Sequence, residues 1–234
     1  MKFAAVSDLH YPVFSKLFIK SLEKLSKDIE FFILAGDIAS KGSSEFFAKV
    51  VGLIKKYFPN IDIYACFGNE EYDEEHENLK KIKEVVFLED ELKIVNIKTT
   101  KIALIGTRGV IDKPTPWQRK NISNIINVYR QRIEKIKNLI LEAKGKAETI
   151  ILFSHYAPTY STLKGERKEI YPFLGSIKME KVIRETKPDI AVHGHAHNGT
   201  GFCVINTTRI YNVALPLNKK ITTIDLYKGL ERFW

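Results

Sequence analysis

Cysteine is scarce in this chain, and neither Cys66 nor Cys203 has a spacing partner for a metal site or a disulfide framework. Two buried thiols in a reducing compartment are the favoured interpretation, and we predict a cytoplasmic protein. Long hydrophobic runs are also missing, so neither a membrane-spanning helix nor membrane association is expected. The short apolar stretch at the start is broken by Asp8 and His10, which favours a first strand over a signal peptide.

Arginine is scarce relative to lysine, supplying only eight of the 37 basic residues in a chain of formal net charge +9. A basic chain can attract nucleic acid or phosphorylated substrates. The lysines are scattered among glutamates, however, which is typical of a solvated surface. Nucleic acid is therefore admitted as a partner but not favoured. The composition leaves the oligomeric state open.

Apolar runs alternate with helical patterns in the first half of the chain. The successive segments are Phe3–Val6, 14–27, Phe31–Ala35, 44–57 and Ile61–Phe67. This alternation indicates βαβ units and a parallel sheet, and continuously apolar strands indicate a sheet covered on both faces. With no linker or repeat in 234 residues, we expect a single α/β domain over residues 1–234.

The second half is expected to contain one long helix from Trp117 to Lys144, because isoleucines recur there at three- and four-residue steps. The segment 156–175 lacks a clear period and is predicted to be a long loop. A helix should start at Ser176 and end before Pro188. The tail, 202–227, should complete a second sheet.

Polar side chains of metal-ligand type follow five of the apolar runs. The set consists of Asp8, His10, Asp37, Asn69, His155, His195 and His197. If the strands are parallel, these side chains share the sheet edge at which ligands bind. Nitrogen and oxygen donors without thiolate suit Mn, Fe, Zn or Ni. Because seven side chains exceed the needs of one ion, we predict a pair sharing a carboxylate, about 3.5–4 Å apart, an arrangement that commonly promotes phosphoester hydrolysis.

With these residues the chain resembles the calcineurin-like metallophosphoesterase superfamily, whose pattern is D-x-H, G-D, G-N-H-[DE], H and G-H-x-H. The resemblance implies a four-layer α/β/β/α sandwich, two divalent ions with Mn foremost, and attack on a phosphoester by a hydroxide bridging them. It assigns Asp8, His10 and His197 to the first ion. It assigns Asn69, His155 and His195 to the second ion, with Asp37 bridging the two.

The chain departs from the family pattern at Glu70, where the family has a histidine that stabilises or protonates the leaving group. A carboxylate there should repel phosphate unless it is protonated or turned away. Three interpretations stay open: a neutral acid, a side chain turned away in a slower enzyme that needs good leaving groups, or lost catalysis. The second is favoured, with phosphodiesters preferred over phosphomonoesters. Glu70 and His195 are the catalytic candidates.

Four further residues receive individual predictions. Arg108 follows another predicted strand and is the candidate substrate-binding residue, with a surface ion pair as the alternative. Trp117 is expected to anchor the start of a helix rather than to stack on a base. His76 is expected to be exposed, and His193 to be structural.

Two alternatives to the phosphoesterase remain, a small nuclease and a non-catalytic scaffold of the same fold. The DNA-repair nucleases of the superfamily are longer and keep the motif histidine. Scaffold relatives usually have degraded metal ligands, whereas all seven ligand positions are present here.

Overall fold

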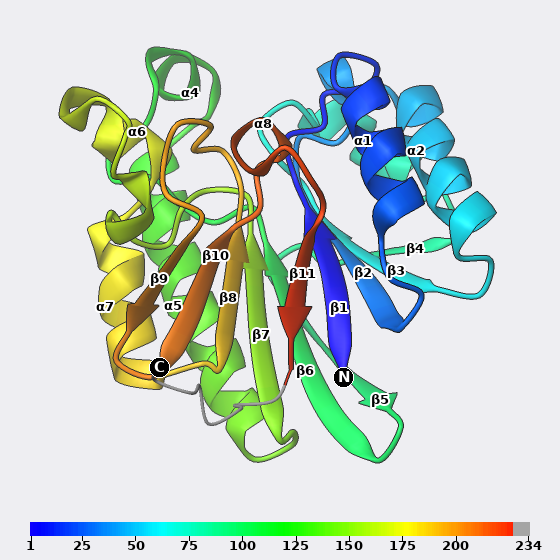
Figure 1. The fold of residues 1–234 in the computed structure, drawn as a ribbon. Coiled ribbons are helices and arrows are strands. Elements are labelled where there is room, and N and C mark those ends of the chain that lie inside the picture. The colour runs from blue at the N-terminus through cyan, green and yellow to red at the C-terminus, as the bar shows by residue number, and fades with distance from the viewer. Residues whose placement is uncertain (227–234) are drawn as a thin grey trace.

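Two β-sheets pack face to face in this protein, and helices cover the outer face of each (Figure 1). The structure, a computed structural model, describes residues 1–226. The two packed sheets with helices on their outer faces confirm the predicted four-layer α/β/β/α sandwich. Residues 227–234, which the predicted single domain includes, lie outside the described residues.

The first sheet has five strands in the order β11-β1-β2-β3-β4. Strands β1 to β4 run parallel, as predicted, and β11 pairs antiparallel with β1 at the edge. The bounds are Lys2–Val6 for β1, Ile29–Ala35 for β2, Asp62–Cys66 for β3, Val85–Phe87 for β4 and Thr222–Asp225 for β11.

The second sheet has six strands in the order β5-β6-β7-β8-β10-β9. Strands β6, β7, β8 and β10 run parallel, and β5 and β9 are antiparallel edge strands. The bounds are Glu91–Ile97 for β5, Thr100–Thr107 for β6, Thr149–Ser154 for β7, Ile190–His193 for β8, Phe202–Ile205 for β9 and Thr208–Asn212 for β10.

Helices α1 and α2 flank the first sheet, and α5 and α7 flank the second (Figure 1). The main helices are α1 (Ser15–Lys24), α2 (Ser44–Tyr57), α5 (Ile125–Lys144) and α7 (Ile177–Thr186). The short helices are α3 (His76–Leu79), α4 (Pro116–Asn121), α6 (Tyr171–Leu174) and α8 (Leu215–Asn218). Caps fix two starts: Ser43 accepts a bond from the Phe46 N–H, and Ser176 from the Met179 N–H.

Strand β2 shows why the central strands are apolar along their whole length. Phe32 and Leu34 pack in the cluster beneath α1 and α2, whereas Phe31 and Ile33 pack between the two sheets. Successive side chains of a strand point to opposite faces, so both faces of β2 are buried. Phe31 stacks on Phe3 of β1 with ring centroids 5.0 Å apart. A third apolar cluster lies beneath α5 and α7.

Two expectations about the second half are wrong. The predicted helix from Trp117 to Lys144 is two helices, because α4 ends at Asn121 and α5 begins at Ile125. Asn124 has a φ of 51°, a left-handed conformation that cannot continue an α-helix. The tail does not all join the second sheet, since β11 pairs with β1 of the first.

The loop predicted over residues 156–175 carries short helical turns at Ser161–Leu163, Lys168–Ile170 and α6. Of the helices in the described part of the chain, none combines the length and apolar character needed to cross a membrane.

Candidate metal centre

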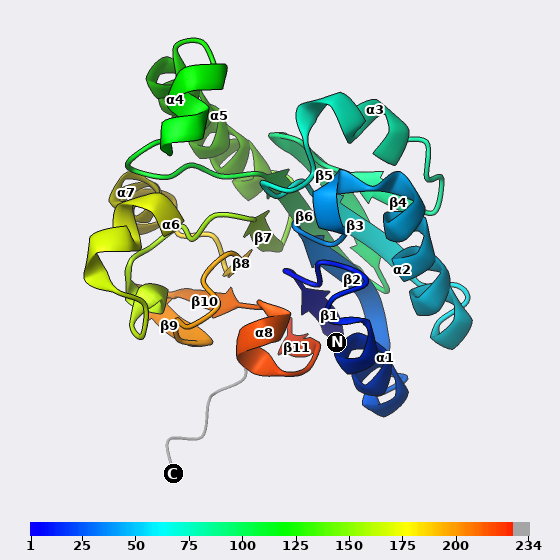
Figure 2. The same ribbon diagram turned by 90° about the horizontal axis from the view of Figure 1, so that it is seen from above.

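Five loops leave the same edge of the paired sheets, at the carboxyl ends of β1, β2, β3, β7 and β8. Figure 2 looks onto this edge, with α4, α6 and α8 around it. Because these strands run parallel, residues far apart in sequence meet here. The structure brings together all seven predicted ligands: Asp8, His10, Asp37, Asn69, His155, His195 and His197.

Asp8, His10 and His197 form one group, in which potential ligand atoms all lie within 4.8 Å of one another. His197 Nε2 is 3.0 Å from Asp8 Oδ1. The rings of His10 and His197 meet edge to face, with centroids 5.7 Å apart. This group is the predicted ligand set of the first ion without its bridge.

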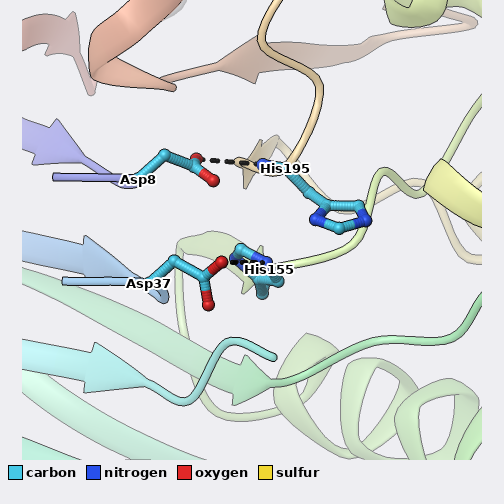
Figure 3. A group of neighbouring side chains, drawn as sticks. All are labelled: Asp8, Asp37, His155 and His195. Atoms are coloured by element: carbon cyan, nitrogen blue, oxygen red, sulfur yellow. Dashed lines mark hydrogen bonds and ion pairs between the residues drawn. The ribbon is translucent and has the colours of Figure 1, made fainter. Parts of the chain in front are cut away.

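Asp8, Asp37, His155 and His195 form a second group by the same criterion (Figure 3). His155 Nε2 lies 3.4 Å from Asp37 Oδ2 and 3.0 Å from the amide oxygen of Asn69. The two carboxylates extend from neighbouring strands toward the two imidazoles (Figure 3). Donors predicted for the second ion therefore surround Asp37.

His10, Asp37 and Glu70 form a third group. Asp37 belongs to two of the three groups, as a bridging carboxylate should, and Asp8 also belongs to two. The groups overlap through these carboxylates and through His10, so the residues form one continuous cluster.

Four of these residues hold a left-handed backbone conformation, with φ of 55° at Asp8, 42° at His10, 52° at Asp37 and 69° at His195. The conformation is uncommon for residues other than glycine and stores strain of roughly 1–3 kcal/mol each. Strain gathered at one sheet edge marks a site at which side-chain direction is held against local preference.

Two glycines allow the loops to approach the carboxylates closely. A Cβ atom at Gly68 would stand 2.1 Å from Asp37 Oδ1, and one at Gly194 would stand 2.4 Å from Asp8 Oδ2. Any side chain at these positions would displace the carboxylates, so glycine is required by packing.

The buried carboxylates experience opposing influences. Burial, and then the negative charges of Glu71 and Asp8, raise the pKa of Asp37 well above its usual value. Burial also acts to raise the pKa of Asp8, but the contact with His197 and nearby imidazole charge outweigh it and hold that pKa below its usual range. Asp8 is fully buried and Asp37 is 2% exposed. A cation beside Asp37 would relieve the repulsion that it now experiences.

The imidazole pKa values are also shifted in opposite directions. Burial lowers the pKa of His195 to about 3, and it lowers the pKa of His155 as well. Both rings are therefore neutral at physiological pH, which leaves a nitrogen lone pair available for a metal. The contact with Asp8 raises the pKa of His197. Neutral imidazoles beside buried, mutually repelling carboxylates fit a pair of divalent cations.

Glu71 supports the centre in a way that the sequence analysis did not predict. Its carboxylate accepts bonds from the backbone N–H groups of Asp37 (2.7 Å), Ile38 (2.8 Å) and Gly68 (2.7 Å). The side chain is buried and ties the loop after β2 to the loop after β3. Charge-assisted bonds of this kind are strong, so Glu71 positions Asp37. The acidic last position of the G-N-H-[DE] pattern, which Glu71 fills, was the available signal.

Arg108 lies beside the centre but already has protein partners. Its guanidinium donates to the Glu71 carbonyl oxygen at 3.1 Å and to Asp73 at 2.8 Å. The expectation that His76 is exposed is wrong, because its ring is buried and stacks on Phe67 with centroids 3.6 Å apart. His193 is buried, with Nε2 2.8 Å from Thr162 Oγ1, as expected of a structural residue.

A cavity of about 400 Å³ opens beside the second group. Helix α4 and the loop that carries α6 form its far walls, and Trp117 at the start of α4 is 62% exposed. The lining residues are Asn69, Glu70, Tyr72, Arg108, Ile111, Thr115, Trp117, Gln118, Ile122, Tyr156, Phe173 and His195. The lining thus combines polar and charged groups with apolar and aromatic side chains.

An α/β sandwich with carboxylates and imidazoles gathered at one strand edge is suited to hold divalent metal ions. The sequence model of the calcineurin-like phosphoesterase family matches residues 1–199, so the chain belongs to this family. It is a metallophosphoesterase, a hydrolase acting on phosphoric ester bonds, and its family is metal-dependent. No curated protein matches the sequence of the chain.

Solved structures of low identity share the fold. The phosphopantetheinyl hydrolase PptH from Mycobacterium tuberculosis is similar with a TM-score of 0.68 and 13% identity, over 91% of this chain and 88% of that chain. A putative 5'-nucleotidase from Staphylococcus aureus has a TM-score of 0.58 and 18% identity, over 90% of this chain but 48% of its own. GAP50 of Plasmodium has a TM-score of 0.58 and 11% identity, over 92% and 72%. At such identities the likeness shows the fold alone.

Proposed function

We propose that the chain is a dinuclear phosphoesterase that hydrolyses phosphodiesters in preference to phosphomonoesters. The observation that carries the proposal is the overlap of three ligand groups through Asp8, His10 and Asp37. One ion has no need of donors shared in this way, whereas a pair of ions held by a common carboxylate does. Mn²⁺ is the proposed metal, with Fe, Zn or Ni as the alternatives.

The proposed ligands are those that the family pattern assigns, and the structure places them in one cluster. Asp8, His10 and His197 would hold the first ion. Asn69, His155 and His195 would hold the second ion, and Asp37 would bind both. When bound, two such ions lower the pKa of water and neutralise charge that develops on the phosphate oxygens.

The chain's own side chains would hold and orient the ester. His195 lies at the boundary between the metal centre and the cavity, with its ring against Tyr156 at a centroid distance of 5.0 Å. The cavity would take the organic part of the ester, and Arg108, which lines it while bonded to Asp73, would add positive charge to this side of the site. Glu71 keeps Asp37 in place beneath it.

The preference for diesters follows from charge. A monoester phosphate carries about −1.5 to −2 at neutral pH, and a diester carries one negative charge. Glu70 lines the cavity at the position where a histidine would serve the leaving group. Its carboxylate repels the monoester more strongly, and it supplies no imidazolium to the departing oxygen.

With Mn²⁺, the protein is expected to hydrolyse bis(p-nitrophenyl) phosphate at least about tenfold faster than p-nitrophenyl phosphate, measured as kcat/KM, which corresponds to about 1.4 kcal/mol between the transition states. Release of nitrophenolate is the readout. Glu70→His should raise the monoester rate and narrow the ratio, whereas Glu74→His, an exposed neighbour, should not. Absence of turnover with every divalent metal would refute the function, and a monoester preference would refute the substrate class.

We also propose a cytoplasmic location and a single-domain protein. Both cysteines are free, which suits a reducing compartment. Cys66 is buried as expected, whereas Cys203 is only partly buried.

A further inference from the structure

We infer that Glu70 is itself a metal ligand, binding the ion that His10 and Asp37 hold, in place of the leaving-group histidine of the family. The inference rests on the proposed function, because it presumes a pair of ions at this edge. It gives the one departing motif residue a role that neither the family pattern nor the sequence analysis assigns.

The direction of the Glu70 side chain is the first observation. Its Oε2 atom lies 3.2 Å from His10 Nδ1, and a carboxylate oxygen of Glu70 falls within 4.8 Å of ligand atoms from both His10 and Asp37. The favoured interpretation from the sequence turned this side chain away from the centre. The structure instead directs it at a predicted ligand.

The loop around Glu70 fixes that direction. The Glu70 N–H donates to Asp37 Oδ1 at 2.8 Å, so its backbone is anchored to the proposed bridging carboxylate. The Lys41 N–H donates to Glu70 Oε2 at 3.2 Å. The next residue, Glu71, is bonded to the loop after β2. Glu70 thus reaches the centre from a held backbone, although its side chain is 32% exposed.

His10 is the common member of two ligand groups, one with Asp8 and His197 and the other with Asp37 and Glu70. Together the two groups offer three carboxylates and two imidazoles on either side of His10. Oxygen-rich sets of five or six ligands suit Mn²⁺, whereas Zn²⁺ prefers four ligands rich in nitrogen or sulfur. The chemistry of the set selects a hard, high-coordination divalent ion for this half of the centre.

Two simpler roles for Glu70 make different predictions. If Glu70 only orients the His10 ring by accepting a hydrogen bond, Glu70→Gln keeps an acceptor oxygen of the same length. If Glu70 only supplies negative charge, Glu70→Asp keeps the charge while withdrawing the oxygen by one methylene. A ligand is weakened in both variants, because an amide oxygen binds a cation less strongly than a carboxylate and the shorter Asp withdraws its oxygen from the ion. The pair of substitutions therefore separates the three roles.

The experiment is a Mn²⁺ titration of the metal-free full chain, following free Mn²⁺ by electron paramagnetic resonance. The proteins are wild type, Glu70→Gln, Glu70→Asp and the control Glu77→Gln, whose side chain is 85% exposed on α3. We expect both Glu70 variants to weaken one of two Mn²⁺ sites by about 10–100-fold, the range seen for substitutions around metal sites. The Mn²⁺ to Zn²⁺ preference of that site should shift toward Zn²⁺, and the control should match wild type.

Urea unfolding of the metal-free variants shows whether each is folded. If one of Glu70→Gln and Glu70→Asp fails to fold, the other still tests the inference. The inference would be overturned if Glu70→Gln bound both Mn²⁺ ions as tightly as wild type. It would also be overturned if only Glu70→Asp did so, because negative charge would then be the sole requirement. A wild type that binds fewer than two ions would instead overturn the proposed function, so the two failures are distinguishable.

Discussion

Asp37→Asn is expected to lower Mn²⁺-dependent phosphodiester hydrolysis by about 10³-fold or more, since metal-based stabilisation of a phosphoryl transition state amounts to several kcal/mol. The physical reason is the shared position of Asp37. It belongs to two ligand groups, and its oxygens lie against Glu70 N–H and His155 Nε2. An amide offers one weak oxygen ligand and no negative charge between two cations. The measurement is kcat/KM with a nitrophenyl diester at saturating Mn²⁺.

Stability separates this loss from misfolding. Burial and the charges of Glu71 and Asp8 disfavour ionised Asp37 in the metal-free protein. Metal-free Asp37→Asn should therefore unfold at no lower urea concentration than wild type. The matched control is Asp62→Asn, the same change at an exposed position of β3, which should leave kcat/KM unchanged. Retention of more than a tenth of the activity by Asp37→Asn would contradict the bridging role.

Mn²⁺ is expected to raise the unfolding temperature of the wild type by roughly 10–20 °C when present at about 100 times the dissociation constant of each site. Each site then contributes about 2.7 kcal/mol to the folded state, and a chain of this size gains about 2–4 °C per kcal/mol. The stabilisation arises because the ions bind carboxylates that repel one another when the centre is empty of cations. A thermal melt with and without Mn²⁺ is the measurement.

Excess chelator should return the melting temperature to its metal-free value and abolish turnover together. Potassium chloride at matched ionic strength controls for general screening and should produce neither effect. Asp37→Asn should lose at least half of the Mn²⁺-induced shift. An equal shift in the variant and the wild type would mean that the metal binds elsewhere.

The convergence of the seven proposed ligands was predictable because each follows an apolar run. Continuous apolar character along strands such as β2 indicates burial on both faces, and burial of that kind indicates parallel strands. Parallel order then brings Asp8, Asp37 and His155 to one edge without further information. The apolar pattern identified the end of each strand, and the parallel topology explains why those ends lie together.

The helix break at Asn124 could not be predicted in the same way. The isoleucine stripe continues across it, and periodicity reports which face is apolar rather than whether every residue between is helical. The left-handed φ of 51° at Asn124 is a single-residue backbone feature that the apolar stripe does not report. The pairing of β11 with β1 likewise depends on which sheet edge lies within reach, and edge choice is not encoded in strand pattern.

Side-chain direction was the other missing information. His76 stands in an acidic stretch, yet its ring is buried on Phe67. Glu70 was expected to turn away, yet its Oε2 atom lies 3.2 Å from His10 Nδ1. Both outcomes depend on contacts between loops that are distant in sequence, and Glu71 holds two of these loops together. Local pattern identifies residue types at a site but not the rotamers that the assembled loops impose.

The central claim is that two cations share one carboxylate, and electron paramagnetic resonance of the protein loaded with Mn²⁺ tests it most directly. Two Mn²⁺ ions bridged by Asp37 should give the broad spectrum of an exchange-coupled pair at two equivalents, and a spectrum of separate ions in Asp37→Asn. A wild-type spectrum of isolated Mn²⁺ at every loading would contradict the shared centre.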